Sequence, residues 1–298
     1  MPELPEVETL CRQLNTVLPG EKIIQIEVLD PRLGNIARAK VDGAVIFPGS
    51  VPKDSGLEKV AGLIGRRVEA VTRRGKYIHL QVEGGLTAAL HLRMSGRLLY
   101  RPKAALENGR HDPNLQNSGS CPPFSRLVIA FSSGTLVLLD PRRFATFVVQ
   151  PPAWSAPALP DDPLQGLPAR RLWKIARTRR LPVKSFLMDQ RLIAGIGNIY
   201  ACEILFAAGI DPRRPACSLS ATEWRKASKS AAAILRRAVD CRGTTMSDWR
   251  DLFGCSGTNQ DHLEVYSRQG ETCRRCSGRI ERITQGGRGT WFCPSCQK

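Results

Sequence analysis

The chain has 298 residues, 42% hydrophobic and 24% charged, a composition typical of globular proteins that excludes collagen-like and disordered chains. No run approaches the ~18 apolar residues of a membrane span, and the acidic opening MPELPEVETL lacks the apolar core of a secretory signal, so a cytoplasmic protein without a membrane partner is expected. A net charge of +17, from 44 Lys and Arg against 27 Asp and Glu, favours nucleic acid as a partner. A generally basic proteome or attachment to a membrane surface is the alternative explanation of this charge.

The first half of the chain is expected to form one helix followed by a β-sandwich or barrel. The helix is predicted from Leu4 to about Leu18, because acidic side chains favour its N-terminal end and Pro19-Gly20 ends it. Short β-rich segments separated by turn signals follow at residues 22–29, 67–72, 77–82, 86–92, 97–100, 126–131, 135–139 and 145–149. Residues 40–55 and 102–123 interrupt this pattern and are predicted to be surface loops.

The second half changes to a helical pattern. Residues 150–168 carry six prolines, which is typical of a stiff linker. Helices are predicted at residues 183–189, 198–208, 221–237 and 246–252, and a two-stranded hairpin in the basic segment 263–298. The predicted domains are therefore 1–150, a hinge at 151–168, a helical domain at 169–262 and a hairpin at 263–298.

The last four of the ten cysteines have the spacing of a zinc ribbon. Cys273 and Cys276 form one CxxC pair, and Cys293 and Cys296 form a second pair after sixteen intervening residues. Two disulfides or unrelated thiols are the alternatives, and a cytoplasmic location disfavours disulfides. Four thiolates complete a tetrahedral shell, so the predicted Zn²⁺ holds the fold and activates no water.

Two further stretches suggest contacts with DNA. In the turn Gly195-Ile196-Gly197-Asn198, glycines allow close approach of the backbone to a phosphate, and the following helix start offers N–H groups to an anion. Asp140-Pro141-Arg142-Arg143-Phe144 places an aromatic ring beside guanidinium groups, which suits filling a gap in a base stack. An ordinary helix cap and a solvated arginine pair beside a core phenylalanine are the alternatives.

The N-terminus suggests a nucleophile. Removal of Met1 would leave Pro2 with a secondary α-amine, and α-amines titrate near pH 8, so a useful fraction is neutral at physiological pH. Such an amine attacks an electrophilic sugar carbon to give an iminium ion. The adjacent Glu3 is close enough to act as general acid and base.

Five stretches together resemble the formamidopyrimidine-DNA glycosylases, which are bacterial base-excision repair enzymes. The stretches are Pro2-Glu3-Leu4-Pro5-Glu6-Val7-Glu8, His91-Leu92-Arg93-Met94-Ser95-Gly96, Asp140 to Phe144, the run from Leu187 to Pro212, and the closing segment from Gly287 to Gln297. They follow in order along the whole chain. The resemblance implies a multidomain α+β fold: an N-terminal helix plus β-sandwich, a helix–two-turns–helix domain and a zinc-ribbon β-hairpin.

The resemblance also assigns roles in catalysis. It implies that Pro2 attacks C1′ of a flipped-out nucleotide, that Glu3 assists protonation of the sugar, and that β,δ-elimination then cuts the strand. Glu6 would support the site from the first turn of its helix. Lys184 matches a lysine near the damaged base.

The DNA-binding residues are assigned in the same way. Lys76 and His91 resemble phosphate ligands near the lesion, and Asn198 and Arg288 resemble two more. Met94, Arg142 and Phe144 resemble the three residues that fill the void left by the flipped base. For His91 a packed strand histidine, for Lys76 an exposed strand lysine and for Met94 ordinary core filling are the alternatives.

The expected partner is double-stranded DNA carrying oxidised purines or abasic sites, bound by a monomer. Met94 and the stretch from Asp140 to Phe144 favour oxidised purines, chiefly 8-oxoguanine opposite cytosine and formamidopyrimidines, over the oxidised pyrimidines of endonuclease VIII-type enzymes. A lesion-binding or structure-specific DNA-binding protein without catalysis is the alternative from another class; the presence of both Pro2 and Glu3 favours the enzyme.

Overall fold

The computed structural model describes residues 2–30, 33, 39–40, 45–46, 60–103, 121–150 and 162–298. The chain divides into two units. The first unit comprises Met1–Pro2, Glu6–Pro157 and Thr245–Gly257, and the second comprises Glu3–Pro5, Ala158–Thr244 and Thr258–Lys298. Within the described residues, no helix combines the length and the apolar character needed to cross a membrane.

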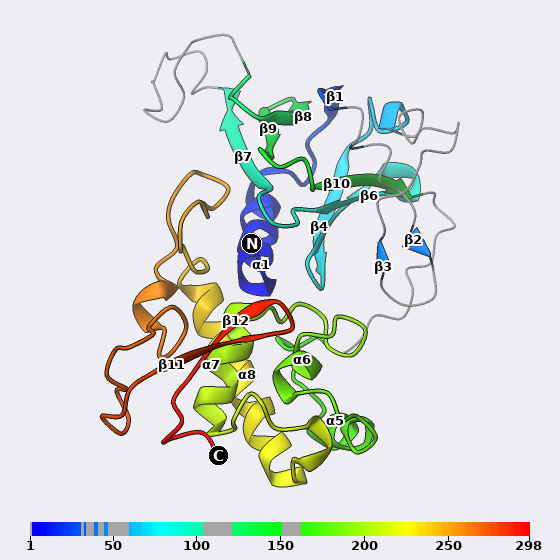
Figure 1. Cartoon of the computed structure of the whole chain (residues 1–298). Coiled ribbons are helices and arrows are strands. Elements are labelled where there is room, and N and C mark those ends of the chain that lie inside the picture. Colours follow the sequence, from blue (N-terminus) through cyan, green and yellow to red (C-terminus); the bar gives the residue numbers. More distant parts are fainter. Residues whose placement is uncertain are drawn as a thin grey trace. The chain divides into compact units, whose positions relative to one another are not determined.

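The first unit contains helix α1 (Leu4–Val17) and two four-stranded antiparallel sheets (Figure 1). One sheet has the order β1-β8-β9-β7 and the other β10-β6-β5-β4. Their strands are β1 (Ile23–Val28), β4 (Val68–Arg74), β5 (Tyr77–Val82), β6 (Leu86–His91), β7 (Arg97–Pro102), β8 (Ser125–Phe131), β9 (Gly134–Leu139) and β10 (Thr146–Gln150). A short 3₁₀ turn, Glu83–Gly85, joins β5 to β6. All eight predicted strands are therefore confirmed.

The core of this unit explains why these segments become strands. Alternate side chains of β8, including Leu127, Ile129 and Phe131, are buried, as alternation along a half-buried strand requires. The helix adds residues at helical spacing to the same core, among them Leu10 and Leu14. The predicted helix and sandwich are thus held by one apolar cluster.

The helix predicted at residues 246–252 is wrong, because this segment has no regular helix and belongs to the first unit. Trp249 and Leu252 are buried in the core of that unit. The side-chain amide of Gln13 donates to the carboxylate of Asp251 at 2.9 Å, and the N–H of Leu252 donates to Oε1 of Gln13 at 3.0 Å. Gln13 on α1 thus binds the N–H of Leu252 and the side chain of Asp251 from a position far away in the sequence.

The second unit is helical, as predicted, with α6 (Val183–Leu187), α7 (Asn198–Ala208) and α8 (Ala221–Asp240). A capping box between Ser220 and Glu223 starts α8. Helix α5 (Ala169–Ala176) was not predicted, although Leu172 and Ala176 are buried at helical spacing. Two short 3₁₀ turns complete the unit, Ala216–Ser218 and Asn259–His262.

The C-terminal hairpin also belongs to the second unit. Strands β11 (Glu281–Gln285) and β12 (Arg288–Phe292) pair antiparallel, and their turn contains two glycines with positive φ, Gly286 and Gly287. Most of the predicted surface loop 40–55 lies outside the described residues. The described part of this region consists of two short paired strands, β2 (Ala39–Lys40) and β3 (Val45–Ile46). The loop at 102–123 lies outside the described residues except for its ends, and Pro102 closes β7.

Candidate functional site

The glycine turn before α7 receives the N-terminal segment of the chain. Glu3 is 2% exposed, and its Oε1 accepts a hydrogen bond from the N–H of Ile199 at 3.0 Å, while the N–H of Leu4 donates to the carbonyl of Gly195 at 3.1 Å. A Cβ on Gly197 would collide with the carboxyl group of Glu3. The helix N-terminus was predicted to offer its N–H groups to a phosphate. In this unit the group that it binds is the carboxyl group of Glu3.

Two further residues of the predicted site, Pro2 and Glu6, differ in burial. Pro2 is partly exposed, whereas Glu6 in the first turn of α1 is 2% exposed. Glu8, on the same helix, accepts a hydrogen bond from Nε of Arg73 on β4 at 2.7 Å. Burial alone would raise the pKa of Glu8, but hydrogen bonds from Arg73 and Arg12 hold it below its usual value. The acidic opening motif therefore contains two buried carboxyl groups, Glu3 and Glu6, and a third, Glu8, whose pKa is lowered by arginine contacts.

The tip of the C-terminal hairpin gathers three more predicted residues in the second unit. The carbonyl of Gly289 accepts from Nδ2 of Asn198 at 3.0 Å and from Nζ of Lys184 at 3.1 Å. Lys184 also donates to Oγ1 of Thr290 at 2.6 Å, is 1% exposed, and has a pKa lowered mainly by burial. Arg288 at the start of β12 is exposed. Asn198 and Lys184 thus hold the strand that presents Arg288.

In the first unit, the structure places Lys76 and His91 at the same end of the neighbouring strands β5 and β6. Lys76 lies in the tight turn between β4 and β5, and His91 ends β6 opposite Tyr77. Nδ1 of His91 accepts from the N–H of Arg93 at 3.0 Å, so the proton of the neutral ring sits on Nε2. Burial, with the charges of Arg93 and Lys76, lowers the pKa of His91 to about 3. His91 therefore offers an uncharged N–H donor next to a cationic lysine.

The three residues predicted to fill a void in DNA are all exposed. Met94 is 49% and Phe144 is 44% exposed, against an ordinary tendency of large apolar side chains to be buried. The guanidinium of Arg142, also exposed, lies 4.8 Å from the centroid of the Phe144 ring. Core filling, the alternative for Met94, is thereby excluded in this structure.

The residue that holds this cluster, Asp140, was named in the sequence analysis but assigned no role. The carboxylate of Asp140, which is fully buried, accepts from Oγ of Ser95 at 2.5 Å and from the N–H groups of Phe144 at 2.6 Å and Ala145 at 2.7 Å. A fourth bond comes from the N–H of Arg142 at 3.2 Å. An aspartate directly before a turn is the available sequence signal, since its side chain often binds backbone N–H groups that follow.

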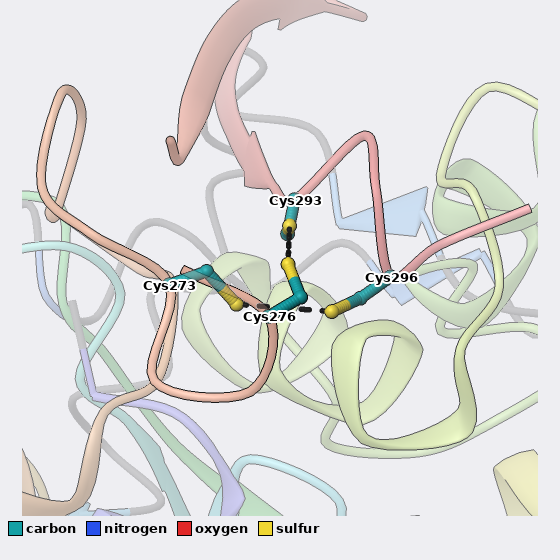
Figure 2. A group of neighbouring side chains, drawn as sticks. All are labelled: Cys273, Cys276, Cys293 and Cys296. Carbon is teal, nitrogen blue, oxygen red and sulfur yellow. Dashed lines mark hydrogen bonds between the residues drawn. The ribbon is translucent and has the colours of Figure 1, made fainter. Parts of the chain in front are cut away.

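The four predicted metal ligands lie together in the second unit (Figure 2). All four sulfur atoms lie within 4.8 Å of one another, with Cys273 and Cys296 at 3.8 Å and Cys276 and Cys293 at 3.4 Å. Such a cluster of four thiol groups matches the tetrahedral sulfur shell of a structural zinc ion. The residues fit Zn²⁺, and the site leaves no ligand position for a reacting water.

Family models match three parts of the chain. The formamidopyrimidine-DNA glycosylase N-terminal domain matches residues 1–147, the formamidopyrimidine-DNA glycosylase H2TH domain matches residues 160–249, and a zinc finger found in FPG and IleRS matches residues 270–298. Together with the four clustered cysteines, the last match establishes a structural zinc site.

Curated relatives and solved structures agree with these matches. A formamidopyrimidine-DNA glycosylase of Roseiflexus sp. is 37% identical over the full length of both chains, and one of Moorella thermoacetica is 39% identical over 95% of this chain and 94% of that protein. A Lactococcus lactis Fpg in complex with abasic-site DNA superposes with a TM-score of 0.83 at 28% identity, covering 99% of both chains. The fold and the zinc site define a zinc-finger protein of the helix–two-turns–helix class. The chain belongs to the formamidopyrimidine-DNA glycosylase family.

Proposed function

We propose that the chain is a base-excision repair DNA glycosylase and AP lyase that removes oxidised purines from double-stranded DNA. The observation that carries this proposal is the placement of Glu3, directly after Pro2, on the N-terminus of α7 by its bond to Ile199. The curated relatives and the matching solved structures support this class of reaction. The curated relatives are named glycosylases, and the L. lactis Fpg structures contain abasic-site or Fapy-dG DNA.

The nucleophile in this proposal is the α-amine of Pro2. Its nitrogen lone pair forms a bond to C1′, the bond from C1′ to the damaged base breaks, and the departing base takes up a proton from solvent. The carboxyl group of Glu3 takes the proton that the Pro2 nitrogen loses and passes it to the sugar ring oxygen, which opens the ring and leaves an iminium ion. Loss of the C2′ proton then expels the 3′ phosphate, and a second elimination expels the 5′ phosphate.

The DNA backbone is proposed to bind cationic and N–H donor groups in both units. In the first unit these are Lys76 and the Nε2–H of His91, and in the second unit Asn198 and Arg288. A neutral histidine donor keeps its hydrogen bond across the physiological pH range, because its pKa is lowered to about 3 by burial and by neighbouring charges. Lys184 is assigned an indirect role, since its ammonium group is bound to Gly289 and Thr290.

Exposed Met94, Arg142 and Phe144 support the choice of substrate. An enzyme that extrudes a base must fill the space that the base leaves, and apolar wedges with an arginine suit that task. These residues favour 8-oxoguanine opposite cytosine and formamidopyrimidines. The protein is further proposed to act as a monomer in the cytoplasm.

Borohydride trapping on a duplex containing 8-oxoguanine opposite cytosine tests the proposal, with protein whose N-terminus has been sequenced. Reduction converts the iminium ion into a stable cross-link, which is expected to map to Pro2. DNA binding without a cross-link, in protein with a free Pro2, would favour the DNA-binding protein without catalysis. A cross-link formed with oxidised pyrimidines in preference to 8-oxoguanine would favour an endonuclease VIII-like substrate range.

A further inference from the structure

Two separate turns carry the exposed residues assigned to void filling. Met94 lies between β6 and β7, whereas Arg142 and Phe144 lie between β9 and β10. Both turns bind the same buried group, since Ser95 and three N–H groups of residues 142–145 all donate to the carboxylate of Asp140. One side chain therefore joins the two turns within the first unit.

The bonds divide evenly between the two carboxylate oxygens. Oδ1 accepts from the hydroxyl of Ser95 and the N–H of Arg142, and Oδ2 accepts from the N–H groups of Phe144 and Ala145. Only an acceptor with two equivalent oxygens satisfies four donors in this way; an asparagine would turn an NH₂ group toward two of them. The arrangement requires an ionised carboxylate at position 140.

The backbone of Asp140 is fixed as well. Its N–H donates to the carbonyl of Phe124 at 2.9 Å, and its own carbonyl accepts from Nε of Arg126 at 2.8 Å. With every polar group of the residue bound and the side chain fully buried, Asp140 has little freedom to move. The two turns are thus tied to the sheet formed by β1, β8, β9 and β7.

We propose that Asp140 and Ser95 are positioning residues that join the Met94 turn and the Arg142–Phe144 turn into one preformed wedge. This inference rests on the proposed function. Inserting side chains into a base stack costs unstacking energy, and flexible turns would add the entropy of ordering them. A wedge that is already ordered in free protein avoids the second cost. Neither Asp140 nor Ser95 needs to touch DNA for this effect.

The Ser95→Ala variant separates positioning from folding, because it removes one bond between the turns and leaves the three N–H bonds to Asp140 in place. Ser95→Thr keeps the hydroxyl and serves as the conservative variant. Ser133→Ala is the matched control, since it removes another serine hydroxyl of this unit, one paired with Tyr100. Asp140→Asn is the stronger variant and is read together with its thermal unfolding curve.

Two measurements report how well the wedge enters the base stack. One is the single-turnover rate of 8-oxoguanine excision, and the other is the fluorescence of 2-aminopurine placed next to the lesion, which rises when the neighbouring base is unstacked. Ser95→Ala is expected to lower both the excision rate and the rate of the fluorescence rise about tenfold, as for loss of a hydrogen bond to a charged group. Ser95→Thr and Ser133→Ala are expected to match the unaltered protein. In the Asp140→Asn background, Ser95→Ala is expected to add little, because the bonded pair is already broken.

A single-stranded oligonucleotide with an abasic site distinguishes failure of this inference from failure of the proposed function. No opposite base is present there, so the wedge is not needed, and Ser95→Ala is expected to form the borohydride cross-link as fast as the unaltered protein. A slower cross-link in Ser95→Ala, or unchanged excision and fluorescence on the duplex, would overturn the positioning role. Absence of the cross-link in the unaltered protein would instead overturn the proposed nucleophile.

Discussion

The carboxylate of Glu3 binds the backbone N–H of Ile199, 196 positions further along the chain, at 3.0 Å. Glu3, Leu4 and the Gly195–Asn198 turn therefore form a single structural feature of the second unit. The turn needs glycine at position 197 because the Glu3 carboxyl group occupies the space of a Cβ. This relationship allows the acid–base role of Glu3 to be tested apart from its structural role.

Replacing Glu3 by Gln is expected to abolish base excision with little loss of stability. Glutamine keeps an oxygen that accepts the Ile199 N–H bond, but it supplies no proton at neutral pH. The free energy of unfolding is expected to change by less than about 1 kcal/mol, the usual weight of one hydrogen bond. Excision of 8-oxoguanine under single-turnover conditions and urea unfolding are the two measurements. Full excision activity in this variant would refute the assigned role.

Gly197→Ala is expected to slow excision by displacing the Glu3 carboxyl group. A displacement of about 1 Å in a catalytic group is enough to cost on the order of 100-fold in rate. Binding to a duplex with a tetrahydrofuran abasic analogue is expected to change much less, because the variant retains the cationic groups. Excision and binding are compared in the same preparation. A loss in binding as large as the loss in rate would show that the turn itself contacts DNA, as the sequence alone suggested.

Cys273→Ser is expected to unfold the C-terminal hairpin, since a structural zinc site contributes on the order of 10 kcal/mol to such modules. The loss would also remove the Gly289 carbonyl that Asn198 and Lys184 bind. Zinc content by atomic absorption, and DNA affinity by fluorescence anisotropy, measure the effect. Cys217→Ser, which changes a cysteine away from the four-sulfur cluster, is the control. Undiminished DNA affinity in zinc-free Cys273→Ser protein would contradict the role of the hairpin.

Arg93→Gly is expected to stabilise the protein. Arg93 has a φ of 55°, a left-handed conformation that costs a residue with a Cβ about 1 kcal/mol and that glycine adopts freely. The substitution keeps the backbone N–H that binds His91, so the histidine retains its proton on Nε2. Thermal unfolding of this variant is compared with that of Ser267→Gly, since Ser267 also has a positive φ, at 64°. A lower midpoint for Arg93→Gly alone would mean that its side chain stabilises the fold.

The sequence predicted the parts of the fold that depend on local pattern. The strands follow from alternation of buried and exposed side chains, and α1 from apolar spacing between acidic and Pro-Gly ends. The segment 246–252 has helical spacing between Trp249 and Leu252, but its hydrogen-bond partner is Gln13, more than 200 residues earlier. No local pattern contains that partner, so the helix prediction failed.

The candidate site shows the same division. The zinc ligands were found because their spacing alone implies a tetrahedral sulfur site. Asp140 was part of a recognised motif, yet its bond to Ser95 joins two turns 45 positions apart, which only the three-dimensional structure brings together. The burial of Lys184 beneath the hairpin tip depends in the same way on distant residues, here Gly289 and Thr290.

Acid is expected to destabilise the fold through His79 on β5. His79 is 7% exposed, and burial together with the charge of Arg74 lowers its pKa to about 4, against about 6.5 in an unfolded chain. The unfolded state therefore binds a proton first as the pH falls. The stability that comes from the neutral ring is complete above pH 6.5 and is lost toward pH 4, by up to about 1.4 kcal/mol per pH unit.

The His79→Gln variant tests this expectation by urea unfolding at several pH values. At pH 7.5 His79 is neutral in both the folded and the unfolded protein. The difference in stability between variant and unaltered protein at this pH therefore measures only the change in packing and hydrogen bonding. That difference serves as the baseline. Between pH 6.5 and pH 4.5 the unaltered protein is expected to lose stability more steeply than the variant. Parallel curves of stability against pH would show that His79 is protonated in the folded state as readily as in the unfolded chain. The burial of His79 would then not explain the loss of stability in acid.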